Sequence, residues 1–168
     1  MNEKTLIRTS ILSPEKNYKV LDLFHGYGKI WEQIKRKGFK VDIVKIDKKN
    51  KDKENIVCDN LKILPSLNLM DFDIIDCDSY GVPFKQLEII FKKKYHGFLF
   101  ITFIQSQFGR LPVRFLNELG YTTNMINKIP SLFNRNGIEK FKQYLFFRGI
   151  TQIQRISINN KHYMGMEV

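Results

Sequence analysis

The chain has 168 residues, a formal net charge of +11, and 43% apolar and 27% charged residues. This length suits one domain over residues 1–168, and the balance of apolar and charged residues excludes both a disordered tail and a membrane-spanning segment. The N-terminus lacks the apolar stretch of a signal peptide, and Cys58 and Cys77 have no metal-binding or disulfide spacing. We therefore expect a cytoplasmic protein with no metal site.

Apolar runs alternate along the chain with segments of helical periodicity, which predicts an α/β fold. The predicted elements are strands at 18–24, 40–46, 55–58, 73–77 and 97–104, helices at 29–37, 84–94 and 112–119, a charged loop at 48–54, and a final antiparallel pair at 143–150 and 152–158. Right-handed crossovers would place helices on both faces of a mainly parallel, Rossmann-like sheet with a C-terminal antiparallel hairpin. Ligands of such sheets bind at the carboxyl ends of the strands, where every motif below falls.

A glycine-rich turn follows the first predicted strand, in the segment Asp22-Leu-Phe24-His25-Gly26-Tyr-Gly28. Glycines permit a tight bend and the close approach of a ligand, although a plain strand-to-helix turn would need them as well. The D-x-F-x-G-x-G pattern resembles motif I of the class I S-adenosylmethionine-dependent methyltransferases, in the form found in nucleic-acid N-methyltransferases. The resemblance implies that the aspartate, the phenylalanine and both glycines border the methionine half of the cofactor. His25 is predicted to face solvent.

Asp47 ends the second predicted strand, 21 residues after Gly26. A carboxylate at this spacing in a nucleotide-binding fold accepts hydrogen bonds from both ribose hydroxyls, and the alternative is a solvated aspartate beside two lysines. The resemblance further implies that Asp59 lies against the adenine amino group, and Asn60 is assigned to the cofactor site with it. An ordinary Asp-Asn turn is the alternative for that pair.

The segment after the fourth predicted strand reads Asp76-Cys-Asp78-Ser79-Tyr80-Gly81-Val-Pro. It resembles motif IV of amine-methylating enzymes, above all the I-D-x-D-P-Y-G-x-P phrase of the tRNA guanine-N2 dimethyltransferases. The resemblance implies that Asp78 accepts hydrogen bonds from the target amine and that Tyr80 stacks on an extruded base. Asp76 is assigned to the cofactor, and Ser79 and Gly81 to the substrate. Ser79 replaces the family's proline, which predicts a more relaxed loop. In the alternative interpretation, Asp76 and Asp78 only cap the loop and the ring of Tyr80 packs against the protein.

The strand at 97–104 leads into a polar loop that resembles the corresponding region of the same family. Thr102, Gln105 and Ser106 are expected near the site, and we predict that Gln105 and Arg110 contact the substrate, because a loop at the carboxyl end of a strand is well placed to do so.

Basic residues in the last third of the chain are interleaved with Phe133, Phe141 and Tyr144. The basic residues are Arg110, Arg114, Arg135, Lys140, Lys142 and Arg148. This mixture suits a nucleic-acid surface, on which cations meet phosphates and rings stack on bases. The net charge supports the same partner, although the lysine-rich composition typical of AT-rich genomes would raise it too. Specificity is expected from the loops of the domain or from a partner protein.

Together these features predict an S-adenosylmethionine-dependent methyltransferase that acts on an exocyclic amine of a nucleic-acid base, with RNA favoured over DNA. Two alternatives stay open: a catalytically silent cofactor-binding module that assists a partner, and a small-molecule or protein methyltransferase. A Rossmann oxidoreductase is disfavoured, because Gly28 is not followed by the third glycine of a G-x-G-x-x-G pattern.

Overall fold

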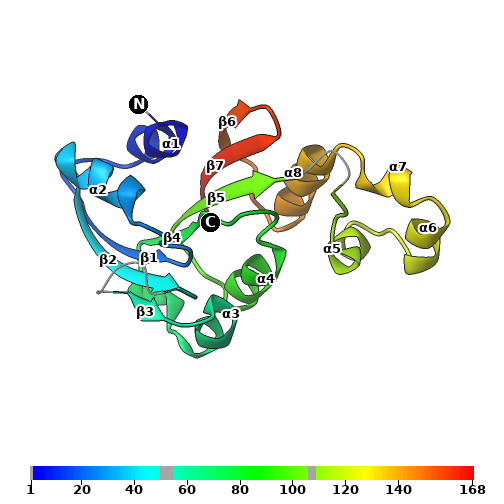
Figure 1. Cartoon of the computed structure of the whole chain (residues 1–168), viewed down its shortest axis with the longest axis horizontal. Helices are drawn as coiled ribbons and strands as arrows, with labels where there is room; N and C mark the ends of the chain where they lie inside the picture. The colour runs from blue at the N-terminus through cyan, green and yellow to red at the C-terminus, as the bar shows by residue number, and fades with distance from the viewer. Residues whose placement is uncertain (1, 50–54, 106–108) are drawn as a thin grey trace.

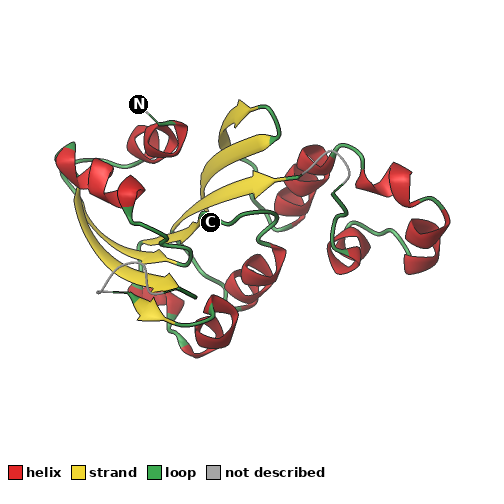
Figure 2. Cartoon of the chain, in the orientation of Figure 1, coloured by secondary structure: helices red, strands yellow, loops and turns green. Residues whose placement is uncertain are grey.

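A computed structural model describes residues 2–49, 55–105 and 109–168 of the chain (Figures 1 and 2). Its centre is a seven-stranded sheet with the strand order β3-β2-β1-β4-β5-β7-β6. The strands are β1 (Asn17–Asp22), β2 (Lys40–Asp47), β3 (Ile56–Val57), β4 (Ile74–Cys77), β5 (Phe98–Ile104), β6 (Gln154–Ile158) and β7 (Lys161–Glu167). The first five strands are parallel, whereas β7 runs antiparallel to both β5 and β6. The predicted fold class is confirmed.

Helices cover both faces of this sheet (Figure 1). They are α1 (Glu3–Ile11), α2 (Lys29–Arg36), α3 (Asn60–Ile63), α4 (Phe84–Lys92), α5 (Val113–Glu118), α6 (Thr123–Lys128), α7 (Pro130–Asn134) and α8 (Gly137–Phe147), with short 3₁₀ turns at Leu64–Ser66 and Leu69–Asp71. On one face, Trp31 and Ile34 of α2 pack with Phe100 of β5. On the other face, side chains of α4, α5 and α8 form the larger core. Burial of these two apolar layers is the main driving force for the fold.

The chain changes direction across the sheet between β1 and β4. From β1 it proceeds outward to β2 and β3, and then it returns to β4 and continues to β5 on the other side. Such a reversal opens a crevice at the carboxyl ends of the two strands that flank it, where open α/β sheets bind ligands. The turn after Asp22 and the turn after Cys77 both lie at this crevice.

The C-terminal prediction is wrong in one element. The segment 143–150 belongs largely to α8 and not to a strand, because Phe141, Tyr144 and Leu145 recur at helical spacing and bury one face of the helix. The antiparallel pair exists, but it consists of β6 and β7, joined at Asn159, whose φ of 53° suits a tight hairpin turn. The other predicted strands and helices agree with the structure to within two residues at each end.

Two further segments differ from the prediction or lie beyond it. Helix α1 was not predicted, and it packs on α2, β6 and β7. Most of the predicted charged loop, residues 50–54, falls outside the described residues, as does Ser106. No helix among the described residues is long and apolar enough to cross a membrane.

Candidate active site

The glycine turn after β1 is built around a buried histidine. His25 Nδ1 lies 2.8 Å from Asp22 Oδ2, and only 7% of the histidine is exposed, so the predicted solvent-facing position of His25 is wrong. The imidazole lies against Gly28, where an added Cβ would come within 2.5 Å of His25 Nε2. Gly28 also has a φ of 68°. Close approach and positive φ together require glycine at this position.

Asp47 joins the end of β2 to the glycine turn. The Gly26 N–H donates to Asp47 Oδ2 at 2.8 Å, and the Lys49 N–H donates to Asp47 Oδ1 at the same distance. Each carboxylate oxygen retains capacity to accept another hydrogen bond. The glycine bend and Asp47, which the sequence assigned to the two ends of one ligand, are therefore direct neighbours.

A cavity of about 290 Å³ opens beside this turn, at the ends of β1 and β4. Three carboxylates line it, from Asp22, Asp76 and Asp78, together with Phe24, Gly26, Gly28 and the N-terminal end of α2. Gly28 is the N-cap of α2 and has no side chain to cap the helix, so backbone N–H groups of the first turn remain available for a ligand. The cavity thus combines backbone donors with three carboxylates, two of which are paired with cations of α1: Asp76 with Arg8 and Asp78 with Lys4.

Asp76 is held within the protein. Arg8 Nη2 donates to Asp76 Oδ1 at 2.6 Å, Arg8 Nε donates to Oδ2 at 3.0 Å, and Trp31 Nε1 donates to Oδ2 at 2.8 Å. Burial raises the pKa of Asp76 to about 7; Arg8 opposes this shift, and the carboxylates of Asp22 and Asp78 add to it. The sequence predicted that Asp76 contacts the cofactor. Because internal donors bind both of its oxygens, we instead assign Asp76 to the support of the cavity.

Asp78 binds the ammonium group of Lys4. Lys4 Nζ donates to Asp78 Oδ1 at 2.6 Å and to Oδ2 at 2.7 Å, and Thr102 Oγ1 donates to Oδ1 at 2.6 Å. Lys4 also lines the cavity. The sequence placed Thr102 near the site without a role, and the structure shows that its hydroxyl fixes the Asp78 carboxylate against β5.

The loop after Asp78 is anchored rather than relaxed. Ser79 N–H donates to Cys77 O at 2.8 Å, and the buried Ser79 hydroxyl donates to Thr102 O at 3.3 Å. Proline would remove the first of these bonds. This geometry points to a structural role for Ser79 in place of the predicted substrate contact. Tyr80 is 95% exposed, so its ring is not packed, and Gly81 O accepts a hydrogen bond from Ile104 N–H.

Two predicted cofactor residues serve the surrounding structure. Asp59 is the N-cap of α3 and pairs with Lys48 at 3.1 Å, which lowers the pKa of its carboxyl group. Asn60 is buried, where its amide donates to Leu23 O and accepts from Gln86. Neither lines the cavity at β1 and β4. Contact with adenine stays a prediction for Asp59, whereas both polar atoms of Asn60 already have internal partners.

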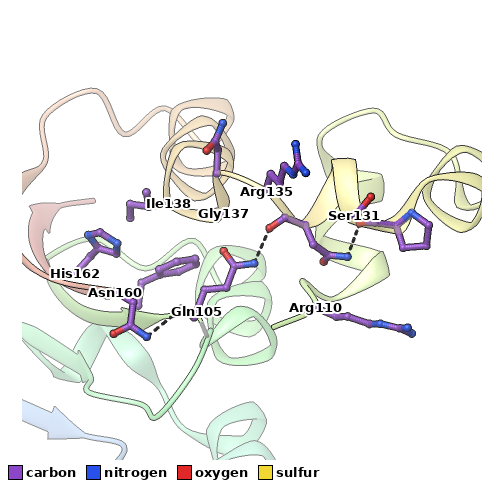
Figure 3. A pocket seen from close by; sticks show the side chains of 12 residues that line it. Gln105, Arg110, Ser131, Arg135, Gly137, Ile138, Asn160 and His162 are labelled. Atoms are coloured by element: carbon purple, nitrogen blue, oxygen red, sulfur yellow. Dashed lines mark hydrogen bonds between the residues drawn. The ribbon is translucent and has the colours of Figure 1, made fainter. Parts of the chain in front are cut away.

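Gln105 and Arg110 line a different cavity, at the end of β5 (Figure 3). The Gln105 amide donates to Gly109 O and Asn134 O, so it fixes the local backbone. The rings predicted to stack on bases lie in the core, since Phe133, Phe141 and Tyr144 are all buried. That part of the predicted nucleic-acid surface is wrong, because apolar aromatic side chains at helical spacing pack inward.

Sequence reasoning missed the contribution of the N-terminal helix. Lys4 and Arg8 reach carboxylates roughly 70 residues away in the sequence, which no local pattern reveals. The signal that was available is Asn2, whose side chain caps Lys4 N–H and starts α1. Among the described residues, no group of three or more His, Cys, Asp or Glu side chains is arranged to hold a metal ion.

No family model and no curated protein matches this chain. Solved structures do. A SAM-dependent methyltransferase from Archaeoglobus fulgidus superposes with a TM-score of 0.58 at 16% identity, over 99% of this chain and 93% of that one. The plantazolicin methyltransferase BamL, solved with SAH, gives 0.58 at 14% identity, over 98% and 82%. The CurJ carbon methyltransferase gives 0.56 at 12% identity, over 98% of this chain but only 53% of its own. The chain therefore has the Rossmann-like fold of the class I SAM-dependent methyltransferases.

Proposed function

We propose that the chain is an S-adenosylmethionine-dependent methyltransferase. The observation that carries this proposal is the bond from Gly26 N–H to Asp47, because it joins the glycine turn to the acidic residue, the two features that the resemblance assigns to opposite ends of one cofactor. The cofactor carries a sulfonium and an ammonium group, and three carboxylates line the adjoining cavity. Opposite charges at short range in a partly buried site attract strongly. The residues of the turn and the cavity therefore fit the cofactor, which supplies the methyl group when bound.

Each part of the cleft then has a binding task. Asp47 would accept hydrogen bonds from the ribose hydroxyls, since each of its oxygens has a further acceptor site. The backbone of the Gly26–Gly28 turn and the first N–H groups of α2 would hold the amino-acid carboxylate. Asp22, fixed by His25, would face the ammonium group.

The acceptor in this proposal is an amine at Asp78. The ion pair with Lys4 supports this assignment, because both Asp78 oxygens already accept hydrogen bonds from a nitrogen, at 2.6 and 2.7 Å. A target amine that displaces Lys4 would donate to the same oxygens and direct its lone pair towards the cavity. Thr102 keeps the carboxylate in place during this exchange. Positioning of this kind contributes much of the rate in group transfer.

We propose further that the amine belongs to a nucleic-acid base, with RNA favoured over DNA. The ring of Tyr80 lies two residues from Asp78 and is 95% exposed, so a base could stack on it without any rearrangement of the core. The net charge of +11 would attract a polyanion.

A methyl-transfer assay with labelled cofactor tests this proposal, run on total tRNA, ribosomal RNA, DNA and a pool of small amines. Calorimetry with S-adenosylhomocysteine accompanies it. Transfer to RNA that the Asp78→Asn variant loses, with cofactor binding retained, is the expected result. Asp73→Asn is the matched control, because Asp73 lies at the opposite end of β4 and binds Lys19 N–H. Cofactor binding without transfer to any acceptor would contradict the activity.

Small-molecule methylation is the second candidate. Two similar structures carry names that point in this direction, one a methyltransferase for plantazolicin and the other a carbon methyltransferase. Transfer to small amines, with none to any polymer, would favour this candidate over the first.

A further inference from the structure

A second cavity, of about 700 Å³, lies at the end of β5 and the start of β7 (Figure 3). Its walls come from the β5 end, the hairpin turn and the segment between α7 and α8. The polar side chains on it include Gln105, Arg110, Arg135, Asn160 and His162. No aspartate or glutamate lines it among the described residues. The cavity therefore presents cations and amide or imidazole groups to a ligand, with no carboxylate to repel an anion.

The arginines of this cavity differ from their neighbours along the chain. Arg114 pairs with Glu88, and Arg148 pairs with Glu118. Arg110 and Arg135 have no carboxylate partner within the part of the chain that the structure describes. Figure 3 shows their side chains apart from each other, with Arg110 directed away from the other labelled residues. Two separated guanidinium groups match successive phosphates of a strand better than they match one compact phosphate.

The framework that carries these arginines is fixed by amide hydrogen bonds. Gln105 Nε2 donates to Gly109 O and to Asn134 O, at 2.8 Å each, and Asn160 Nδ2 donates to Gln105 O at 3.2 Å. Gly137 packs so closely on Gln105 that an added Cβ would overlap its Oε1 atom. Gly109 and Asn134 precede Arg110 and Arg135 directly, so Gln105 fixes the backbone from which both arginines extend. Such preorganisation lowers the entropic cost of binding.

The loop that carries Tyr80 lies between this cavity and the cleft at β1 and β4. Asp78 accepts a hydrogen bond from Thr102, and Gly81 O accepts one from Ile104 N–H, so residues 78–81 run along the C-terminal end of β5. Gln105 follows immediately. A single nucleic-acid strand could therefore place a base at Tyr80 and the neighbouring phosphates at Arg110 and Arg135.

We propose that the Arg110–Arg135 cavity binds the phosphate backbone of the substrate nucleic acid next to the target base. The inference rests on the proposed function and adds to it the surface that selects a polymer over a free nucleotide. The group that the cavity recognises is a phosphate oxyanion. A nucleic-acid strand, a mononucleotide and inorganic phosphate all carry this group, and the experiment distinguishes these three ligands.

The test is fluorescence anisotropy with a labelled single-stranded RNA, titrated with wild type and with the double variant Arg110→Gln/Arg135→Gln at several salt concentrations. We expect the double variant to lose about tenfold or more in affinity. The slope of log affinity against log salt should fall by about 1.4, for two phosphate contacts on a single strand. The matched control, Arg36→Gln/Lys37→Gln, removes two exposed charges at the end of α2, and its slope should stay near that of wild type.

Competition with AMP and with inorganic phosphate separates the sources. Neither should displace the RNA at concentrations near that of the RNA itself. Equal affinity for AMP and RNA, or equal losses in the double variant and its control, would overturn the proposal. Calorimetry with S-adenosylhomocysteine on the same variants keeps the two proposals apart. Unchanged cofactor binding with weakened RNA binding supports the backbone site, and absent cofactor binding in wild type counts against the methyltransferase alone.

Discussion

The cleft at β1 and β4 and the cavity at β5 and β7 treat charge in opposite ways. In the cleft, Lys4 and Arg8 are bound by Asp78 and Asp76, and the carboxylates line the space that a ligand would enter. In the cavity, Arg110 and Arg135 have no carboxylate partner among the residues that the structure describes. The comparison teaches that a net charge of +11 does not describe a uniformly basic protein. Both sites lie at the carboxyl ends of the parallel strands, but the cleft is lined by three carboxylates and the cavity by two arginines.

The largest expected effect comes from breaking the internal pair beneath the cleft. Arg8→Met leaves Asp76 buried without its cation, so we expect a loss of about 3–5 kcal/mol in the free energy of unfolding. Urea denaturation measures it. Arg8→Met/Asp76→Asn should recover part of the loss, since the amide carries no charge and can still accept from Trp31. A loss in the single variant no larger than about 1 kcal/mol would mean that the pair does not support the cleft.

The next effect tests the glycine turn. Gly28→Ala should cost about 2–3 kcal/mol, the sum of left-handed backbone strain and the lost Asp22–His25 bond. Gly26→Ala is the matched control: its φ is also positive, at 61°, but the nearest atom to an added Cβ is 3.8 Å away. It should show the strain alone, about 1–2 kcal/mol. Equal losses in denaturation of the two variants would refute the packing of His25 on Gly28.

Asp47→Asn should weaken S-adenosylhomocysteine binding by about tenfold, which is roughly 1.4 kcal/mol. The amide presents one acceptor oxygen in place of two, so it cannot serve Gly26 N–H, Lys49 N–H and the ribose together. Asp42→Asn makes the same charge change at an exposed position of β2 and should leave the affinity unchanged. Calorimetry that finds the same Kd for all three proteins would remove Asp47 from the cofactor site.

The smallest effect is a pH dependence. The pKa of Asp76 is raised from 3.8 to about 7, mainly by burial. Its contribution to stability is therefore present at low pH and lost as pH rises through about 7. For the proposed cofactor the sign is opposite, because protonation of Asp76 as pH falls below about 7 would remove a negative charge from the wall of the cavity. S-adenosylmethionine should lose about 1 kcal/mol of binding relative to S-adenosylhomocysteine, whose sulfur is neutral. Parallel pH profiles for the two ligands would contradict this.

The parallel half of the fold and the glycine turn could be predicted because local signals define them. Apolar runs end at Asp22 and Asp47, and the spacing between Gly26 and Asp47 is fixed by one strand–helix–strand unit. Helix α8 could not be predicted in the same way. Its aromatic residues Tyr144, Phe146 and Phe147 favour strands by propensity, and this propensity competes with the helical spacing of its buried residues, which pack against α4 and α5.

The site was predictable where its residues follow strands and unpredictable where distant segments meet. The motif singled out Asp78 as a candidate, but its partners Lys4 and Thr102 come from α1 and β5. The anchoring of Ser79 was not predictable, because its hydrogen bonds to Cys77 and Thr102 depend on the register of β4 against β5. Tertiary contacts, and not composition, therefore set the roles of the carboxylates.

The most direct measurement is a crystal structure of the protein with S-adenosylhomocysteine. We predict that the ribose hydroxyls bond to Asp47 and that the amino-acid tail lies along the Gly26–Gly28 turn with the sulfur facing Asp78. A ligand bound elsewhere, or a cleft that stays empty at saturating ligand, would contradict the account.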